Sequence, residues 1–204
     1  RKSAVKKRHI KGQRTARENI ADLTDGGELT EYGPLAIAPQ RKRRSVEDLI
    51  LNTPADGMVG GLAEVNSNLF DESQTQCVVI SYDYTVLAGT QGGQNHRKKD
   101  RLFEIAQKWE LPVIFFTEGG GGRPGVTDGL QVAGLDCLAF GLWAELSGDV
   151  PLVGITSGYC FAGNAAILGC CDVIIATEDA NIGMGGPAMI EGGGLGTYHP
   201  SEVG

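Results

Sequence analysis

Two glycine-rich segments hold the residues best suited to chemistry. The first reads Glu118-Gly-Gly-Gly-Gly-Arg-Pro-Gly125 and follows an apolar run at residues 113–116. The second begins Gly158-Tyr-Cys-Phe-Ala-Gly-Asn and follows another apolar run at residues 151–155. Consecutive glycines lose much conformational entropy on folding, so we expect the first segment to be needed for its bare backbone. Each segment lies between a predicted strand and a predicted helix, where unpaired backbone N–H groups favour a negative charge.

A nucleotide-binding function fits the first segment poorly. Gly120, Gly122 and Gly125 match the Gly-x-Gly-x-x-Gly pattern, but Pro124 lies inside it. In addition, no strand ends in an acid about 20 residues later, as dinucleotide sites require. The chain contains no Gly-Lys-Ser/Thr motif of the phosphate-binding loops. A flexible surface loop remains an alternative, although a plain linker has no need to follow a buried strand.

Short apolar runs and helical patterns alternate around these segments. Runs rich in β-formers predict strands at residues 58–65, 77–81, 84–88, 112–116, 151–155 and 173–177. Helical spacing predicts helices through residues 102–109, 132–146 and 162–171. Near the start, Thr15 and Glu18 form a capping-box pattern that predicts a short helix, and residues 46–51 form a second amphipathic segment. This alternation indicates an α/β domain.

The charge is divided unevenly along the chain. The net charge is −7, yet residues 1–44 contain 12 of the 18 Lys and Arg with only 5 acids, so they carry +7 and the remainder −14. We therefore distinguish a basic N-terminal segment, residues 1–44, from a core, residues 45–204. The segment suits a phosphorylated cofactor, an acidic subunit or nucleic acid, or it is a solvated arm. Its aromatic residues are too few for base stacking, so we expect no nucleic-acid partner.

Cysteine usage and hydropathy exclude further classes of protein. None of the five cysteines shows the paired spacing of a zinc site, so we expect no metal and a reducing compartment. No apolar run approaches the ~20 residues of a membrane span. The basic start also lacks the apolar core of a secretory signal. We expect a cytoplasmic protein with no membrane partner.

The second segment resembles a known superfamily. Residues 158–173 read Gly-Tyr-Cys-Phe-Ala-Gly-Asn-Ala-Ala-Ile-Leu-Gly-Cys-Cys-Asp-Val. This run resembles the crotonase superfamily, in which it begins Gly-Tyr, passes through three small residues and ends Cys-Asp-Val or Cys-Asp-Ile. The resemblance implies a crotonase-like ββα superhelix. It also implies that the N–H of Gly163 is an oxyanion donor and that its partner comes from Gly121 or Gly122.

The side chains of this run narrow the chemistry. Enoyl-CoA hydratases of the superfamily carry a glutamate at the position of Ala166, and alanine cannot act as an acid or base. Clp-type proteases carry their nucleophilic serine at the position of Ala162. The resemblance therefore disfavours both hydration and proteolysis.

Three more segments resemble the carboxyltransferases of acetyl-, propionyl- and methylcrotonyl-CoA carboxylases. Residues 11–19 resemble the opening signature Gly-(Lys/Arg)-x-Thr-Ala-Arg-Glu, and residues 83–89 resemble the strand Asp-Phe-Thr-Val-x-Gly-Gly. Residues 118–123 resemble the turn Asp-Ser-Gly-Gly-Ala-Arg, with Gly119 and Gly122 in place of serine and alanine. The resemblance extends over about residues 11–195.

This resemblance implies a function and partners. The chain would be the acyl-CoA-binding half of a biotin-dependent carboxyltransferase, incomplete as a single chain. It would move a carboxyl group from carboxybiotin to the α-carbon of a short acyl-CoA through an enolate, with biotin as the base. The partners would be a second carboxyltransferase half, a biotin carrier and a biotin carboxylase, in a homo- or hetero-oligomer.

The resemblance also implies contacts with coenzyme A. The residues concerned are Arg14, Arg17, Lys98, Arg123 and Ala162. Arg17 can equally pair with a carboxylate, and a solvated helix face explains Lys98 almost as well. Two other functions stay open. One is a stand-alone crotonase-type CoA hydrolase, isomerase or decarboxylase, which needs a titratable group near Gly163. The other is a non-catalytic CoA-binding module of a carboxylase assembly.

Overall fold

A six-stranded mixed sheet forms the centre of the protein. The computed structural model describes residues 1–123 and 138–204. The strands lie in the order β1-β2-β3-β4-β5-β7; the first three are antiparallel neighbours, and β3, β4, β5 and β7 run parallel. Their bounds are β1 Thr30–Glu31, β2 Met58–Glu64, β3 Gln76–Tyr82, β4 Val113–Phe116, β5 Leu152–Thr156 and β7 Val173–Ala176. Because β4 and β5 are parallel neighbours, the segments that follow them leave the sheet at the same edge.

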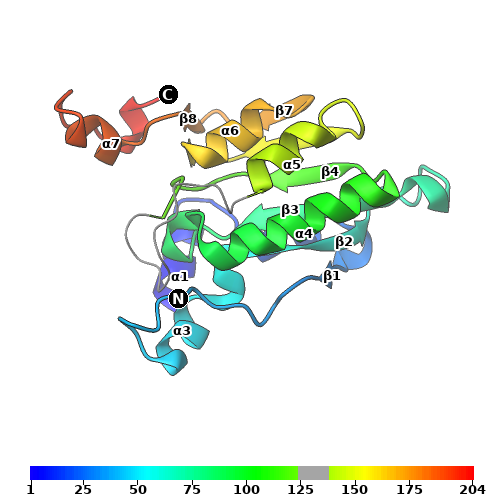
Figure 1. Ribbon diagram of the computed structural model, residues 1–204, viewed down its shortest axis with the longest axis horizontal. Helices are drawn as coiled ribbons and strands as arrows, with labels where there is room; N and C mark the ends of the chain where they lie inside the picture. Colours follow the sequence, from blue (N-terminus) through cyan, green and yellow to red (C-terminus); the bar gives the residue numbers. More distant parts are fainter. Residues whose placement is uncertain (124–137) are drawn as a thin grey trace.

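Helices cover both faces of this sheet. α4 (Gly93–Trp109) and α5 (Ala139–Leu146) lie side by side on one face, as Figure 1 shows, and α2 (Ala16–Leu23) packs on the other. The period of two along β3 explains the two layers. Val78 and Ile80 join the cluster under α4 and α5, whereas Val79 joins the cluster under α2. The other helices are α1 Lys2–Ile10, α3 Val46–Asn52, α6 Gly163–Gly169 and α7 Pro187–Gly192.

Aromatic packing ties α5 to its neighbours. The ring of Trp143 lies 4.8 Å from that of Phe103 in α4 and 6.0 Å from that of Phe115 in β4. The Trp143 indole N–H donates to the carbonyl of Ile167 in α6 at 3.0 Å. The indole therefore fills the core and also holds α6, which begins in the second glycine-rich segment.

The predicted α/β fold class is confirmed, and the strands predicted before and after the glycine-rich segments are present. The strand predicted at residues 84–88 is wrong. Asp83 accepts a hydrogen bond from the backbone N–H of Thr85 at 2.9 Å, which forms a turn, and Leu87 and Ala88 follow with left-handed φ values of 49° and 53°. The predicted helix at 132–146 lies in part outside the described residues.

Several elements were not foreseen from the sequence. They are the two parallel strands β6 (Tyr159–Phe161) and β8 (Asn181–Gly183), which form a small separate sheet, and helix α1; strand β1 and helix α7 were likewise not predicted. The capping box of α2 is present, with the Thr15 N–H donating to Glu18 at 2.7 Å. Residues 1–44 pack on the same sheet as the rest, because β1 pairs with β2 and α2 buries Ala16 and Ile20. The division at residue 44 is therefore one of charge.

Candidate functional site

The two glycine-rich segments meet at the edge of the sheet. We call residues 117–123, after β4, the first loop, and residues 157–163, after β5, the second loop. The N–H of Gly119 donates to the carbonyl of Tyr159 at 2.7 Å, and the N–H of Phe161 donates to the carbonyl of Gly119 at 2.9 Å. The first loop therefore runs beside β6, and the proximity expected from parallel neighbouring strands is present.

Gly121 lies at the closest approach of the loops. Its φ is +85°, and a Cβ there would lie 2.7 Å from the Cβ of Ala162 and 3.0 Å from the carbonyl oxygen of Phe161. Only glycine fits this position without strain. The Gly121 N–H donates to the side-chain oxygen of Asn164 at 3.1 Å. This donor is already used within the protein.

Gly122 differs from Gly121 in the direction of its backbone. Gln91 forms a parallel bridge with Gly122 by donating to the carbonyl of Gly121 at 2.7 Å and accepting from the N–H of Arg123 at 2.9 Å. In such a bridge the N–H of the central residue points away from its partner. A Cβ on Gly122 would meet no atom of the described residues within 4 Å. Of the two candidate donors, Gly121 already binds Asn164, whereas the N–H of Gly122 points away from Gln91.

In the second loop, Gly163 is the first residue of α6. Ala162 precedes it at φ 50° and ψ −121° and donates its own N–H to the carbonyl of Gly183 at 2.8 Å. The first N–H groups of a helix have no partner within the helix. The sequence pattern therefore placed Ala162 and Gly163 correctly at a strand-to-helix turn, and Ala162 contributes the tight backbone there.

A buried ion pair holds the start of the first loop. Arg8 of α1 donates to both carboxylate oxygens of Glu118, at 2.9 and 2.6 Å, and to the carbonyl of Arg14 at 2.7 Å. Burial raises the pKa of Glu118, and the hydrogen bonds from Arg8 oppose this effect. A Cβ on Gly158 would lie 2.7 Å from a Glu118 oxygen, so the carboxylate also abuts the second loop.

Arg123, expected to contact coenzyme A, anchors the end of the first loop instead. Its side chain is 3% exposed and donates to Asp56 at 2.7 Å. The same guanidinium donates to the carbonyl and the hydroxyl of Thr90 at 3.0 and 3.2 Å. The second oxygen of Asp56 accepts the backbone N–H groups of Gln94 and Asn95 at the start of α4. All three guanidinium nitrogens thus have partners within the protein.

Lys98 is also turned inwards. Its ammonium donates to the carbonyls of Ala55, at 3.2 Å, and Met58. Burial lowers the pKa of Lys98 to about 8. Two backbone carbonyls thus bind the Lys98 ammonium, and its contact with coenzyme A stays a prediction.

The two N-terminal arginines lie on the surface. Arg14 pairs with Asp22 at 2.5 Å and Arg17 pairs with Glu31 at 2.9 Å, and both arginine side chains are about half exposed. The alternative that Arg17 pairs with a carboxylate is thus realised. Arg14, Arg17, Lys98 and Arg123 do not form one cluster of free cations.

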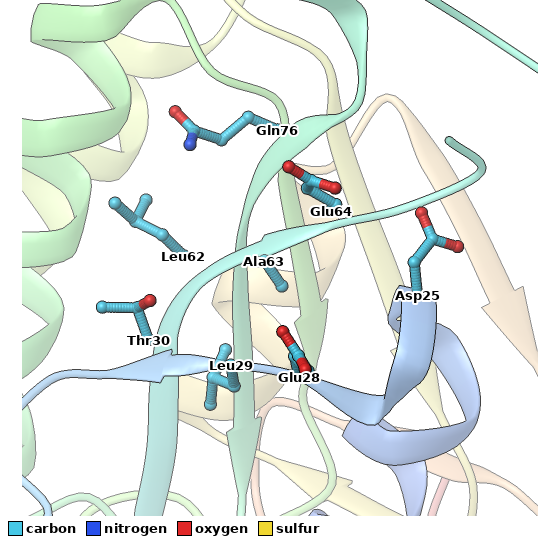
Figure 2. A pocket seen from close by; sticks show the side chains of 8 residues that line it. All are labelled: Asp25, Glu28, Leu29, Thr30, Leu62, Ala63, Glu64 and Gln76. Carbon is cyan, nitrogen blue, oxygen red and sulfur yellow. The ribbon is translucent and has the colours of Figure 1, made fainter. Parts of the chain in front are cut away.

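An acidic pocket of about 600 Å³ opens at the other end of the strands, between β1 and β2. Figure 2 shows the carboxylates of Asp25, Glu28 and Glu64 on one side of it and Leu62 and Thr30 on the other. The backbone N–H of Ser67 binds Asp25 and holds the pKa of its carboxyl below the usual range. Three carboxylates repel phosphate, and the pocket lies where β3 begins rather than where β4 ends. It is therefore poorly suited to coenzyme A.

Within residues 1–123 and 138–204, no group of three or more His, Cys, Asp or Glu side chains is placed to hold a metal ion. No helix in these ranges is long and apolar enough to cross a membrane. The described part of the site therefore offers backbone N–H groups, buried ion pairs and small residues.

Comparison with known proteins agrees with this geometry. The family model of the carboxyl transferase domain matches residues 7–198. The solved structure of a single-chain, multi-domain long-chain acyl-CoA carboxylase is 64% identical with a TM-score of 0.94, covering 100% of this chain and 20% of that one. The transcarboxylase 12S structure with methylmalonyl-CoA and methylmalonic acid bound is 27% identical with a TM-score of 0.77, covering 99% and 37%.

A curated relative, the propionyl-CoA carboxylase beta chain of Saccharopolyspora erythraea, is 30% identical over 161 residues, which cover 78% of this chain and 27% of that protein. The chain spans well under half the length of each of these proteins. The match of the family model over nearly the whole sequence, on a fold whose two glycine-rich loops meet, shows that the chain belongs to the carboxyl transferase domain family.

Proposed function

We propose that this chain forms the acyl-CoA-binding half of a biotin-dependent carboxyltransferase. The observation that carries the proposal is the meeting of the two loops, which brings Gly122 and Gly163 to one edge of the sheet. Each of these residues has a backbone N–H that is directed away from the ladder or helix to which it belongs. Two N–H donors at one place suit the oxygen of a thioester enolate, which carries the charge that develops during the reaction.

In this proposal the chain stabilises the enolate and takes no proton itself. The N–H groups of Gly122 and Gly163 bind the thioester oxygen while the α-carbon loses its proton. Carboxybiotin, brought by a partner carrier, supplies the carboxyl group and, after its release, the base. Ala166 and Ala162 fit this division of labour, because neither can act as a general acid, base or nucleophile.

We further propose that the complete enzyme accepts long acyl chains. The sequence alone suggested a short acyl-CoA, as in the propionyl-CoA carboxylase relative at 30% identity. The carboxylase described as acting on long-chain acyl-CoA is 64% identical and covers the whole chain, so it is the better guide to the substrate. We expect kcat/KM to be at least about tenfold higher for palmitoyl-CoA than for propionyl-CoA in the complete enzyme. Equal values would contradict the long-chain assignment and leave the carboxyltransferase proposal intact.

The partners follow from the same reaction. The proposed enzyme needs a second carboxyltransferase half to hold biotin, a biotin carrier and a biotin carboxylase, either as subunits or as domains of one polypeptide. Proximity of the biotin to the enolate supplies several kcal/mol of the barrier, which free biotin would not provide. We therefore expect carboxylation only from the complete assembly.

A pair of variants at Gly163 tests the donor role. Gly163→Pro removes the N–H, whereas Gly163→Ala keeps it. Both variants add a Cβ, which would lie 2.8 Å from the Gln91 side-chain nitrogen and 3.1 Å from Phe140. Comparing the two variants therefore cancels the effect of this crowded Cβ. Proline is tolerated at the first position of a helix, where the residue needs no helical hydrogen bond.

We expect Gly163→Pro to lower kcat about 100- to 1000-fold relative to Gly163→Ala, with the Kd for acyl-CoA changed only a few-fold. The measurements are a carboxylation assay of the complete enzyme and titration calorimetry with the same thioester. Circular dichroism of both variants checks the fold. Similar kcat values for the two folded variants would rule out the Gly163 donor. Binding of acyl-CoA without any carboxylation by the wild-type assembly would favour a non-catalytic CoA-binding module.

A further inference from the structure

A chain of buried polar side chains runs behind the two loops. It begins at Lys99 of α4, whose side chain is fully buried and donates to the Tyr82 hydroxyl at 2.8 Å and to the Gln91 side-chain oxygen at 3.0 Å. The Gln91 side-chain nitrogen then donates to the Asn164 side-chain oxygen at 3.2 Å. The same oxygen accepts the Gly121 N–H at 3.1 Å. We call Lys99, Gln91 and Asn164 the buried relay.

The orientation of each amide in the buried relay follows from its partners. A lysine ammonium and a backbone N–H can only donate, so the Gln91 oxygen must face Lys99 and the Asn164 oxygen must face Gly121. The Asn164 nitrogen correspondingly donates to the carbonyl of Thr117 at 3.0 Å and approaches that of Gly89 at 3.4 Å. Each of these bonds therefore joins a donor to an acceptor in one arrangement, and flipping either amide would place two like groups together.

The buried relay contacts both of the proposed donor residues. The backbone of Gln91 bonds to the neighbours of Gly122 on either side, as described above. The Gln91 side chain lies directly behind Gly163, because a Cβ on this glycine would come within 2.8 Å of its nitrogen. Asn164 holds the first loop through Gly121 and the end of β4 through Thr117. One glutamine and one asparagine thus connect two loops that are far apart in the sequence.

We infer that Gln91 and Asn164, oriented by Lys99, are positioning residues that fix the spacing of the Gly122 and Gly163 N–H groups. This inference rests on the proposed function, since it concerns the same pair of donors. The first loop contains four glycines and has little stiffness of its own, so an external support must set its geometry. A hydrogen-bonded network in a site closed to water is stronger than the same groups in water and can hold a loop in one conformation.

Gln91→Met in the complete enzyme tests the inference. Methionine has a similar volume but cannot bond to Lys99 or Asn164, while the backbone bonds of residue 91 remain. Small displacements of catalytic groups reduce rates strongly, so we expect kcat to fall about 10- to 100-fold with KM for acyl-CoA within threefold. Gln94→Met, three residues further along the chain, is the matched control and should keep wild-type kcat. In the described part of the chain its hydrogen bond comes from the backbone N–H, which the substitution leaves in place.

A double variant separates positioning from general damage. If Lys99 acts through Gln91, then Lys99→Met with Gln91→Met should lower kcat no more than the worse single variant does. Gln91→Asn, whose amide is one methylene shorter, provides a milder change should the methionine variant unfold. Wild-type kcat in folded Gln91→Met or Gln91→Asn would overturn the inference. A fall in kcat that multiplies in the double variant would also overturn it, because the two residues would then act independently.

The two proposals fail in different ways. Equal kcat values for Gly163→Pro and Gly163→Ala would reject the donor role of Gly163. The buried relay would then have no donors to position. A large difference at Gly163 together with wild-type kcat in Gln91→Met keeps the donors and rejects only the buried relay.

Discussion

Replacing Arg123 by methionine removes one partner of the ion pair that anchors the first loop. Asp56 is fully buried and Arg123 is 3% exposed, so water cannot replace the lost guanidinium without opening the structure. Asp56 keeps its bonds from the Gln94 and Asn95 N–H groups, at 3.0 and 3.1 Å. Methionine fills much of the space of the arginine stem, so the lost free energy comes mainly from the unpaired carboxylate.

The magnitude follows from these contacts. Removing one partner of a buried ion pair costs about 3–5 kcal/mol. Because two N–H groups still bind Asp56, we expect the lower end, about 3 kcal/mol of unfolding free energy. A protein of this size loses about 2–4 °C in Tm for each kcal/mol, which gives a decrease of about 6–12 °C.

Urea and thermal unfolding of the 204-residue chain measure this loss. Arg101→Met is the control, because Arg101 and Glu104 form an ion pair with side chains 62% and 48% exposed. Its unfolding free energy should stay within about 0.5 kcal/mol of wild type. The double variant Asp56→Asn with Arg123→Met should lose less than the sum of the single variants, since it leaves no unpaired charge. An Arg123→Met protein as stable as Arg101→Met would refute the anchoring function.

Two further predictions concern the surroundings of the site. Gly119→Ala should destabilise the chain by about 1–3 kcal/mol in urea unfolding, because its Cβ would lie 2.3 Å from the carbonyl oxygen of Gly89. Gly122→Ala should not, because its Cβ would meet no atom of the described residues within 4 Å, and equal stability of the two variants would contradict the loop geometry. Burial, followed by the positive charges of Lys99 and Arg123, lowers the pKa of His96 to about 3. In the unfolded chain the imidazole takes up a proton near the ordinary pKa of 6.5, whereas in the folded chain it stays neutral at that pH. The stability that neutral His96 contributes is present above pH 6.5 and decreases as the pH falls towards 3. His96→Gln should therefore lose less unfolding free energy than wild type between pH 7 and pH 5. The same loss in both proteins would show that His96 titrates normally.

The sheet could be predicted because its strands are short apolar runs with clear ends. β3, β4 and β5 lie inside the sheet, and their sequences contain Val, Ile and Phe with few polar residues. The error at residues 84–88 has a local cause. Tyr84, Val86 and Leu87 have the composition of a strand, but the Asp83 side chain captures the Thr85 N–H and starts a turn.

Helix α1 and the small sheet of β6 and β8 were missed for a different reason. α1 is rich in lysine and arginine and has no apolar stripe, so nothing in its sequence marks a buried face. Its contribution to the core is Arg8, which is buried only because Glu118 lies opposite it, 110 residues later. β6 contains three residues and pairs with a strand of equal length. Such elements depend on tertiary partners and carry little local signal.

The positions of the glycines where the two loops meet could be predicted from motifs, whereas the partners of the charged residues could not. A motif gives the order of residues along the chain, and Arg123 follows the glycines as the resemblance required. Nothing in the local sequence tells whether its guanidinium faces a ligand or a carboxylate. Its partner Asp56 lies 67 residues away. Gln91 and Lys99 belong to no motif. The packing of α4 against the sheet places Lys99 behind the loops, and the bridge to Gly122 places Gln91 there.

These contacts explain how a loop of four glycines can keep the defined geometry that the proposed donor role requires. Glycine loses more conformational entropy on ordering than any other residue, so a run of four disfavours its own folded geometry. The structure opposes this loss at three points: Arg8 binds Glu118 before the run, Asn164 binds Gly121 within it, and Asp56 binds Arg123 after it. Because a backbone donor has no side chain whose rotamer could correct an error, its accuracy depends on such supports. The buried charges near this site therefore fix the geometry of the loop, and substitutions at them should change kcat before they change the affinity for acyl-CoA.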